Sequence, residues 1–513
     1  MTQNRRRLPY RVIYNQDCTN LFAVTKDCMT STHVDRMVDE VAEGGADLML
    51  INPQAMRANY PSRVWQTFWD GYTPGDRSFF GNVPADTIPR REHMVQQMKR
   101  LADQGIDYVA HSLARCRQQG IAGGVSVRMN DSHDTPYGQS NMLTDFYLEH
   151  PNYHLPLPYR PSGPYTTVTV LDYRRTEVRD HFLALIRELV VEYEPEVLEL
   201  DFLRFPGVFP EGQGAAYAQV LSDFVGEVAS LIHGNAQPVH LLVRLPSTPA
   251  LAVDLGLDAP TWVAEGWVDA ISVGGQFCTS WQSDLSGYRR WVGDRCTVYA
   301  HADSAAAWPD GIEPPTSHRS TTSEWVMGTN PDLLRGFAAA CYAQGADGIY
   351  VFNFFTTREW RKGDPSFTTL GELASPEQLR GSQRTHLLAN AGTLRRNPNA
   401  DPPTQLPLVV ETRQARSLSL LAAAGDAGET AELGVVVQTQ TDVKARDFLA
   451  HLNGCSLGRA SQVAPVTDAQ DAERVREITF TVRATMLRDG RNDIAFRNDG
   501  NAVTLVAIRL RVN

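Results

Sequence analysis

Short apolar strand patterns alternate with longer helical patterns from about residue 10 to residue 390. Repeated strand and helix patterns in this order are typical of βα units around a parallel sheet. Helices are predicted where apolar residues recur on one face, at 32–43, 91–119, 176–193, 215–233 and 332–344. The predicted strands are 10–15, 46–52, 124–130, 197–203, 239–244, 268–273, 296–301 and 348–353. Eight regular units favour an α/β fold of the closed (β/α)8 or TIM-barrel type over a doubly wound open sheet.

The pattern changes near residue 390. The segment 397–407 is rich in Pro and Asn and is typical of a linker. The strand-like alternation of apolar and polar residues then recurs at 408–412, 432–438, 477–482 and 503–512. We therefore expect a catalytic barrel over 1–395 and a small all-β sandwich, as an accessory C-terminal domain, over 405–513.

Two connections are too long for simple turns, 53–89 and 131–171. Each follows a predicted strand, so each should lie on the catalytic face of a barrel. Loops of this length in compact domains are usually functional. Both are rich in aromatic residues, which suit the flat apolar faces of sugars. Trp65 and Trp69 are spaced four apart, as on one helical face, and are predicted to line the substrate site.

The composition removes several classes of function. The 513 residues are 42% hydrophobic and carry a formal net charge of −11. This acidic balance argues against a nucleic-acid partner and an anionic membrane surface. No apolar segment follows Arg5–Arg7 as in an export signal, so a cytoplasmic protein is expected. The 7 cysteines are scattered without a CxxC pair, so no zinc site, disulfide framework or other cofactor is predicted.

The predicted strand 197–203 carries the most informative residues. Side chains alternate along a strand, so Glu199, Asp201 and Leu203 share one face. Two acids on the inner face of a buried strand are costly unless they are paired or used. Asp201 lies nearer the rim and is the candidate nucleophile or base, while Arg204 could pair with either acid. The structural alternative is an Asp–Arg pair that closes the barrel mouth.

The other strands also end in polar residues, which would meet at the same face of the barrel. The segment 128–134 contains a cluster that could bind sugar hydroxyls, supply an acid, bind a metal, or merely cap a loop. The candidate binding residues of this polar ring, besides Arg204, are Asn15, Asp17, Asn52, Arg128, Asn130, His133, Arg244, His301 and Asn353, with Asp131 and Asp303 as further carboxylates.

The segment Leu171–Arg179, followed by a helix and then Leu198–Pro206, resembles a motif of glycoside-hydrolase-like barrels related to the α-amylase superfamily. The resemblance implies that Asp201 is the nucleophile and that the tail is a C-terminal β-sandwich. The chain departs from the superfamily in having Glu199 in place of an Arg and Arg244 in place of an acid. Strand six is followed by 274–276, Gly-Gly-Gln, where related barrels can carry a carboxylate. The acid/base partner stays open among Glu199, Asp303 and Asp131, in that order.

The main hypothesis is therefore a glycoside hydrolase that cleaves an oligosaccharide or glycoside with two carboxylates. A rival is a metal-assisted lyase, isomerase or hydrolase acting on a sugar-derived substrate, with its ligands drawn from Asp17, Asp131, His133, His301 and Asp303. Another is a catalytically inactive carbohydrate-binding barrel. The expected partner is a carbohydrate, and the long aromatic loops leave a homo-oligomer open.

Overall fold

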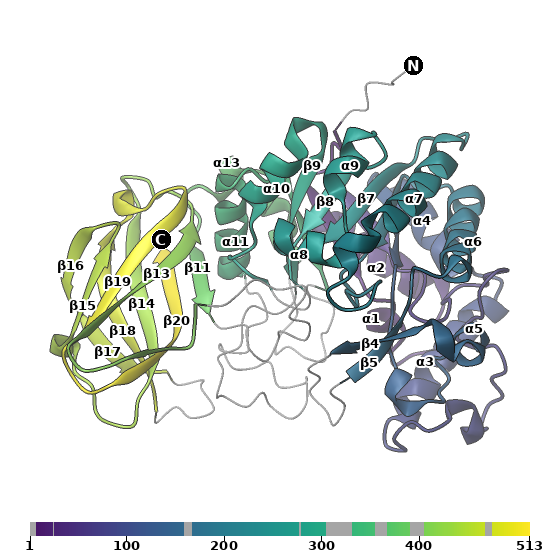
Figure 1. The fold of residues 1–513 in the computed structure, drawn as a ribbon, viewed down its shortest axis with the longest axis horizontal. Coiled ribbons are helices and arrows are strands. Elements are labelled where there is room, and N and C mark those ends of the chain that lie inside the picture. Colours follow the sequence, from purple (N-terminus) through teal and green to yellow (C-terminus); the bar gives the residue numbers. More distant parts are fainter. Residues whose placement is uncertain are drawn as a thin grey trace.

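Eight parallel strands close into a barrel, as the sequence predicts (Figure 1). The computed structural model describes residues 7–23, 25–158, 167–275, 279–303, 331–353, 367–389, 405–466 and 474–513. Around the barrel the strand order is β1-β10-β9-β8-β7-β6-β3-β2. The strands are β1 Val12–Gln16, β2 Leu48–Ile51, β3 Ala122–Arg128, β6 Val197–Asp201, β7 His240–Leu245, β8 Ala270–Val273, β9 Thr297–Asp303 and β10 Gly348–Phe352.

Helices surround the barrel. The longer ones are α2 Ser31–Glu43, α3 Ile88–Asp103, α4 Tyr108–Gln119, α6 Thr176–Tyr193, α7 Gly214–His233, α10 Leu285–Val292 and α11 Pro331–Ala343. The shorter ones are α1 Thr19–Phe22, α5 Asp145–Glu149, α8 Pro249–Leu255, α9 Ala259–Ala264, α12 Thr369–Glu372 and α13 Pro376–Leu379. None of the helices in the described part of the chain combines the length and hydropathy that a membrane crossing requires.

The single helix predicted over 91–119 is wrong, because this region holds two helices, α3 and α4. Between them Gly105 adopts a φ of 74°, which ends the first helix. The Asp107 carboxylate then accepts hydrogen bonds from the backbone N–H groups of Val109 and Ala110 and begins the second. The apolar periodicity continues across this break, which is why the sequence pattern did not separate the helices.

The interior of the barrel is apolar toward the amino ends of the strands and polar toward their carboxyl ends. Ile13, Val197 and Leu242 belong to one buried cluster at the lower level. Since alternate residues of a strand point inward, the next inward positions on β6 and β7 are Glu199 and Arg244. The apolar cluster therefore forms a floor, and the polar residues lie toward the carboxyl ends of the strands, where barrel enzymes carry their active sites.

The described part of the connection 131–171 forms a wall beside this end of the barrel. It contains α5 and an antiparallel hairpin of β4, His154–Pro158, and β5, Thr167–Leu171. Leu155, Leu157 and Val170 of the hairpin share a buried cluster with Phe205, which follows β6. The hairpin therefore supports the segment that carries Asp201 and Arg204.

The C-terminal part is a sandwich of two antiparallel sheets, as predicted. One sheet has the order β11-β20-β14-β18-β17, with β12 paired to β20, and the other has the order β13-β19-β15-β16. The strands correspond to β11 Arg384–Ala389, β12 Leu408–Val410, β13 Gln414–Ala422, β14 Thr430–Gln438, β15 Phe448–Leu452, β16 Cys455–Arg459, β17 Gln462–Pro465, β18 Val475–Arg483, β19 Gly490–Asn498 and β20 Val503–Val512. Leu433, Phe480 and Phe496 pack in the core between the sheets.

The strand β11 joins the two parts of the chain. It precedes the predicted linker and lies within the range 1–395 assigned to the barrel, yet it pairs with β20 of the sandwich. The helix α11 approaches it closely, since a Cβ atom at Gly336 would lie 2.0 Å from the backbone oxygen of Thr385. Figure 1 shows α11 on the side of the barrel that faces the sandwich. The glycine therefore allows the barrel and the sandwich to pack directly against each other.

Candidate active site at the barrel mouth

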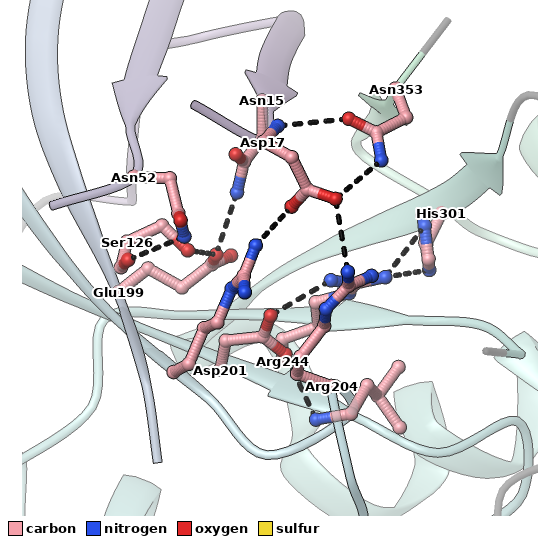
Figure 2. A network of polar contacts seen from close by, with 12 residues as sticks. Asn15, Asp17, Asn52, Ser126, Glu199, Asp201, Arg204, Arg244, His301 and Asn353 are labelled. Carbon is pink, nitrogen blue, oxygen red and sulfur yellow. Dashed lines mark hydrogen bonds and ion pairs between the residues drawn. The ribbon is translucent and has the colours of Figure 1, made fainter. Parts of the chain in front are cut away.

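The centre of the polar mouth is Asp201, at the end of β6. Its side chain is buried, and one carboxylate oxygen accepts a hydrogen bond from Arg244 Nη1 at 3.0 Å. The other oxygen accepts from the backbone N–H of Leu203 at 2.9 Å. Figure 2 shows Asp201 and Arg244 in the middle of the network. An Asp–Arg pair thus exists at the mouth, but its arginine comes from β7 and not from position 204.

Glu199 lies one inward position below Asp201 and is fully buried. Its Oε1 atom accepts hydrogen bonds from Ser126 Oγ at 2.6 Å, Tyr350 OH at 2.9 Å and Asn15 Nδ2 at 3.2 Å. Oε2 has no hydrogen-bond partner among the described residues. Burial, and then the nearby carboxylate of Asp201, raises the pKa of Glu199 to about 7. This carboxyl group can therefore hold or release a proton near neutral pH.

His301 positions Arg244. Its Nε2 atom lies 3.1 Å from Arg244 Nη2, and the guanidinium group stacks 4.4 Å from the ring centroid of Phe352. Burial and the positive charge of Arg244 hold the pKa of His301 well below its ordinary value, so the neutral ring accepts a hydrogen bond from the arginine. Gly274 provides the space, because a Cβ atom there would lie 2.7 Å from the His301 ring. The predicted binding residue His301 thus directs Arg244 toward Asp201.

A second charged group spans the mouth from β1 to the segment after β6. Asp17 is ion-paired with Arg128 and with Arg204, the latter at 3.0 Å, and it accepts from Asn353 Nδ2 at 3.0 Å. Burial alone would raise the pKa of Asp17, but Arg204 and Arg128 outweigh it and hold this pKa well below its ordinary value. Figure 2 shows Arg204 reaching across to Asp17. Asp17 is therefore a permanent anion that ties two sides of the mouth together.

Asp131 belongs to the same charged group. Its oxygens accept from Arg128 Nη1 at 2.8 Å and lie 2.6 Å from His133 Nδ1. Burial acts to raise the pKa of Asp131, but His133 and then Arg128 hold it well below its ordinary value. Asp131 is therefore a poor proton donor at neutral pH.

Asp303 ends β9 on the other side of Arg244. Its carboxylate lies 4.0 Å from His301 Nε2, and its backbone N–H and carbonyl both bond to Thr279 Oγ1 at 2.8 Å. Among the described residues, no group of three or more His, Cys, Asp or Glu side chains is arranged to hold a metal ion. The ligands named for the metal-assisted rival therefore do not form a single cluster in this part of the chain.

The amides of Asn15 and Asn52 lie beside Glu199 (Figure 2). Asn52 donates to the backbone oxygen of Ser126 at 3.2 Å. The amide oxygens of both Asn15 and Asn52 are buried without a hydrogen-bond partner among the described residues. Unsatisfied buried acceptors are costly, so these oxygens favour a ligand that donates hydrogen bonds, such as a sugar hydroxyl. Asn353 adopts a φ of 51° and accepts from the backbone N–H of Asp17.

Asn130 was predicted to bind substrate, but its side-chain hydrogen bonds go to the backbone. Its Nδ2 atom donates to the carbonyl oxygens of Leu171 and Gly207, and its Oδ1 atom accepts from the N–H of Leu171. The side chain is buried and holds the hairpin β4–β5 against the segment after β6. Its role in the structure is to support the wall of the mouth.

Replacing Asn130 by Ala should lower the free energy of unfolding by about 2–4 kcal/mol, because three buried backbone groups lose a partner. Chemical denaturation of both proteins measures the difference. Asn235→Ala is the matched control, since its amide makes one long hydrogen bond of 3.5 Å near the surface. A loss below about 0.5 kcal/mol for Asn130→Ala would contradict the supporting role.

Trp65, predicted to line the substrate site, packs against helix α6. Its indole stacks on His181 of α6 with ring centroids 4.4 Å apart and donates to the His181 backbone oxygen at 3.0 Å. Trp69 packs against the cluster that contains Tyr72 and Phe80. The segment around them forms turns and not a helix, so the i, i+4 spacing has no helical meaning. An indole N–H needs a partner when buried, and α6 supplies it for Trp65.

Ser126, Tyr350 and Phe352 were not predicted as site residues, although all three contact the central charges. Apart from Glu199, the polar site residues predicted from the sequence lie at or near strand ends. The missed signal is the alternation within the strands, since Ser126 lies two residues before Arg128 and Tyr350 two before Phe352. In the barrel, Ser126 is also the direct register partner of Glu199.

Comparison with known proteins gives no family assignment. No family model matches the chain, and no curated protein does. Solved structures that match include a noncanonic maltogenic α-amylase from Thermotoga neapolitana, with 9% identity, a TM-score of 0.39 and coverage of 97% of this chain and 98% of that one. A GH36 α-galactosidase from Geobacillus stearothermophilus has 12% identity, a TM-score of 0.38 and coverage of 98% and 56%. A cycloisomaltooligosaccharide glucanotransferase from Paenibacillus has 10% identity, a TM-score of 0.34 and coverage of 97% and 57%.

This chain thus spans little more than half the length of the α-galactosidase and the glucanotransferase. Because all three TM-scores are low, the fold rests on the strand order of the barrel and the sandwich, and not on these likenesses.

Proposed function

We propose that this chain hydrolyses glycosidic bonds, with Asp201 as nucleophile or base and Glu199 as its proton-donating partner. The observation that carries the proposal is the placement of both carboxyl groups on the inner face of β6, at the catalytic end of the barrel. Arg244 pairs with the Asp201 carboxylate, and Glu199 holds a proton near neutral pH. Two carboxyl groups in different protonation states are what acid-assisted glycoside hydrolysis requires.

The surrounding charges favour Glu199 over Asp131 as the acid. Asp131 is kept as an anion by His133 and Arg128, whereas the Glu199 environment favours the neutral form. Asp303 stays the second candidate, since it lies on the far side of Arg244 beside His301. The partners of these carboxyl groups therefore favour Glu199 over Asp131, and they do not rank Asp303.

The polar mouth also suits a hydroxyl-rich substrate. The buried amide oxygens of Asn15 and Asn52 can accept hydrogen bonds from two hydroxyl groups next to Glu199. We propose that they orient the sugar ring so that its glycosidic oxygen approaches the Glu199 proton. Glu199 gives its proton to the leaving oxygen as the glycosidic bond breaks, and the anomeric carbon is attacked by Asp201 or by a water that Asp201 activates. If Asp201 attacks, a water molecule then cleaves the bond between the sugar and Asp201 and gives up its proton to Glu199.

The pH dependence tests the role of Glu199. An acid must be protonated to act, so kcat/KM should fall as the pH rises through about 7, the pKa of this carboxyl group. Glu199→Gln should lower kcat/KM by about 10²–10⁴-fold and remove this fall. The measurement is kcat/KM on chromogenic glycosides over the range in which the protein stays folded.

Glu196→Gln is the control for that experiment. Glu196 precedes the same strand but lies at its opposite end, where it contacts Tyr10 and the backbone of Gly123. Its replacement should leave the pH profile unchanged. If the Glu199→Gln variant keeps the wild-type rate and its kcat/KM still falls above neutral pH, another group is the acid.

A further inference from the structure

A cavity of about 700 Å³ opens on the outer wall of the barrel, between α6 and α7. It is lined on α7 by residues from Asp223 to Leu231, in the second half of that helix. Since α7 follows β6, it begins at the catalytic face and runs back toward the opposite face. The cavity is therefore separate from the polar mouth and lies toward the other end of the barrel.

The aromatic residue of this cavity is Trp267, between α9 and β8. Its indole is partly exposed and packs against α7 at Gly226. A Cβ atom at Gly226 would lie 3.2 Å from both Cη2 and Cζ2 of the indole, closer than ordinary contact. Glycine within a helix is destabilising relative to alanine, but here it allows the indole to lie against the helix. The helix is thus shaped to hold the tryptophan at the cavity.

The rest of the lining combines apolar and polar side chains. Leu183 and Leu231 supply aliphatic surface beside Trp267. Arg187, Glu227 and Ser230 are exposed at the rim. No hydrogen-bonding or ion-pair partner is found for the Arg187 or Glu227 side chains in the described part of the chain, so both are available to a ligand.

The mixture of charges indicates the class of ligand. Neither an anionic nor a strongly cationic ligand is matched by this lining, because the carboxylates of Asp223 and Glu227 are accompanied by the guanidinium group of Arg187. A purely apolar ligand would leave these groups unmatched. A neutral sugar chain has apolar CH faces for the indole and hydroxyl groups that both donate and accept hydrogen bonds.

We propose that this cavity is a second carbohydrate site, which binds a neutral oligosaccharide against Trp267. The choice of carbohydrate rests on the proposed function of the mouth, while the site itself rests on the cavity and its lining. A chain held here would be anchored on the outer wall at a distance from the reacting groups, which favours a polymeric substrate over a small glycoside.

Isothermal titration of the full chain with maltohexaose, cellohexaose, xylohexaose and mannohexaose tests this proposal. At least one should bind, and Trp267→Ala should weaken its binding by about tenfold. Trp291→Ala is the matched control, because Trp291 is a partly buried tryptophan on another outer helix, α10. It should leave the affinity unchanged within about twofold, a difference well under 1 kcal/mol.

The double variant Arg187→Ala and Glu227→Ala covers the case in which Trp267→Ala fails to fold, since both side chains are exposed. It should weaken binding of the same sugar severalfold. If no hexasaccharide binds, or if binding is insensitive to both variants, the second site does not exist. All titrations use full-length protein that carries Asp201→Asn, so that the mouth does not cleave the sugars, and the result does not depend on whether the mouth hydrolyses glycosides.

Discussion

Replacing Arg128 by Met is expected to lower the free energy of unfolding by about 3–5 kcal/mol at neutral pH. Arg128 is buried and is ion-paired with both Asp17 and Asp131. Its removal leaves two buried carboxylates with one cationic partner fewer, and a buried charge without compensation is strongly destabilising. Urea denaturation of wild type and variant measures the difference.

The same experiment has a pH signature. The folded protein holds the pKa values of Asp17 and Asp131 well below their ordinary values. The two ionised carboxylates therefore stabilise the folded state at neutral pH, and this stabilisation is lost as the pH falls and they become protonated. In the variant this stabilisation is reduced, so the difference in free energy of unfolding between wild type and variant should become smaller in acid. Arg36→Met is the control, since Arg36 is exposed and pairs with Glu40 on the same helix. A loss below about 1 kcal/mol for Arg128→Met would show that the charged group does not hold the mouth together.

Replacing Asp201 by Asn is expected to reduce turnover by at least about a thousandfold, because the carboxylate that we propose as nucleophile or base is lost. The amide keeps the size of the side chain and can still accept from the N–H of Leu203. It cannot neutralise Arg244, so a modest loss of stability is also expected. Initial rates of glycoside cleavage, with far-ultraviolet circular dichroism as the test of folding, separate these two effects.

Asp254→Asn serves as the control for Asp201→Asn. Asp254 is an exposed aspartate on α8, and the same chemical change there should leave turnover within about twofold of wild type. Folded Asp201→Asn protein that retains more than a tenth of the wild-type rate would remove Asp201 from the centre of the mechanism.

The barrel and the position of Asp201 could be predicted because both follow from periodicity. Two-residue alternation places Glu199 and Asp201 on one inner face of β6, and the structure has them there. The break between α3 and α4 could not be seen in the same way, since apolar periodicity continues through it. The membership of β11 in the sandwich could not be predicted either, because its pairing with β20 joins residues more than a hundred positions apart.

The partners of the site residues were harder to predict than their positions. Arg204 was the nearest arginine in sequence to Asp201, yet Arg244 pairs with it and Arg204 reaches Asp17. The orientations of the Asn130 and Trp65 side chains depend on hydrogen bonds to backbone groups of distant segments. These groups belong to Leu171, Gly207 and His181. Sequence spacing carries no information about such contacts, which are decided by how the long loops fold back on the barrel.

The most direct test of the central claim is the fate of the water molecule in the reaction. Wild-type protein and the Asp201→Asn variant should be incubated with oligosaccharides in water labelled with the heavy isotope of oxygen. The masses of the products are then measured by mass spectrometry. Hydrolysis at this mouth predicts two shorter sugars, one of which carries the heavy oxygen at its new reducing end, with no such product from the variant. Fragments whose masses sum to that of the substrate would indicate a lyase, and an unchanged mass would indicate an isomerase or no reaction. Either result would contradict the account.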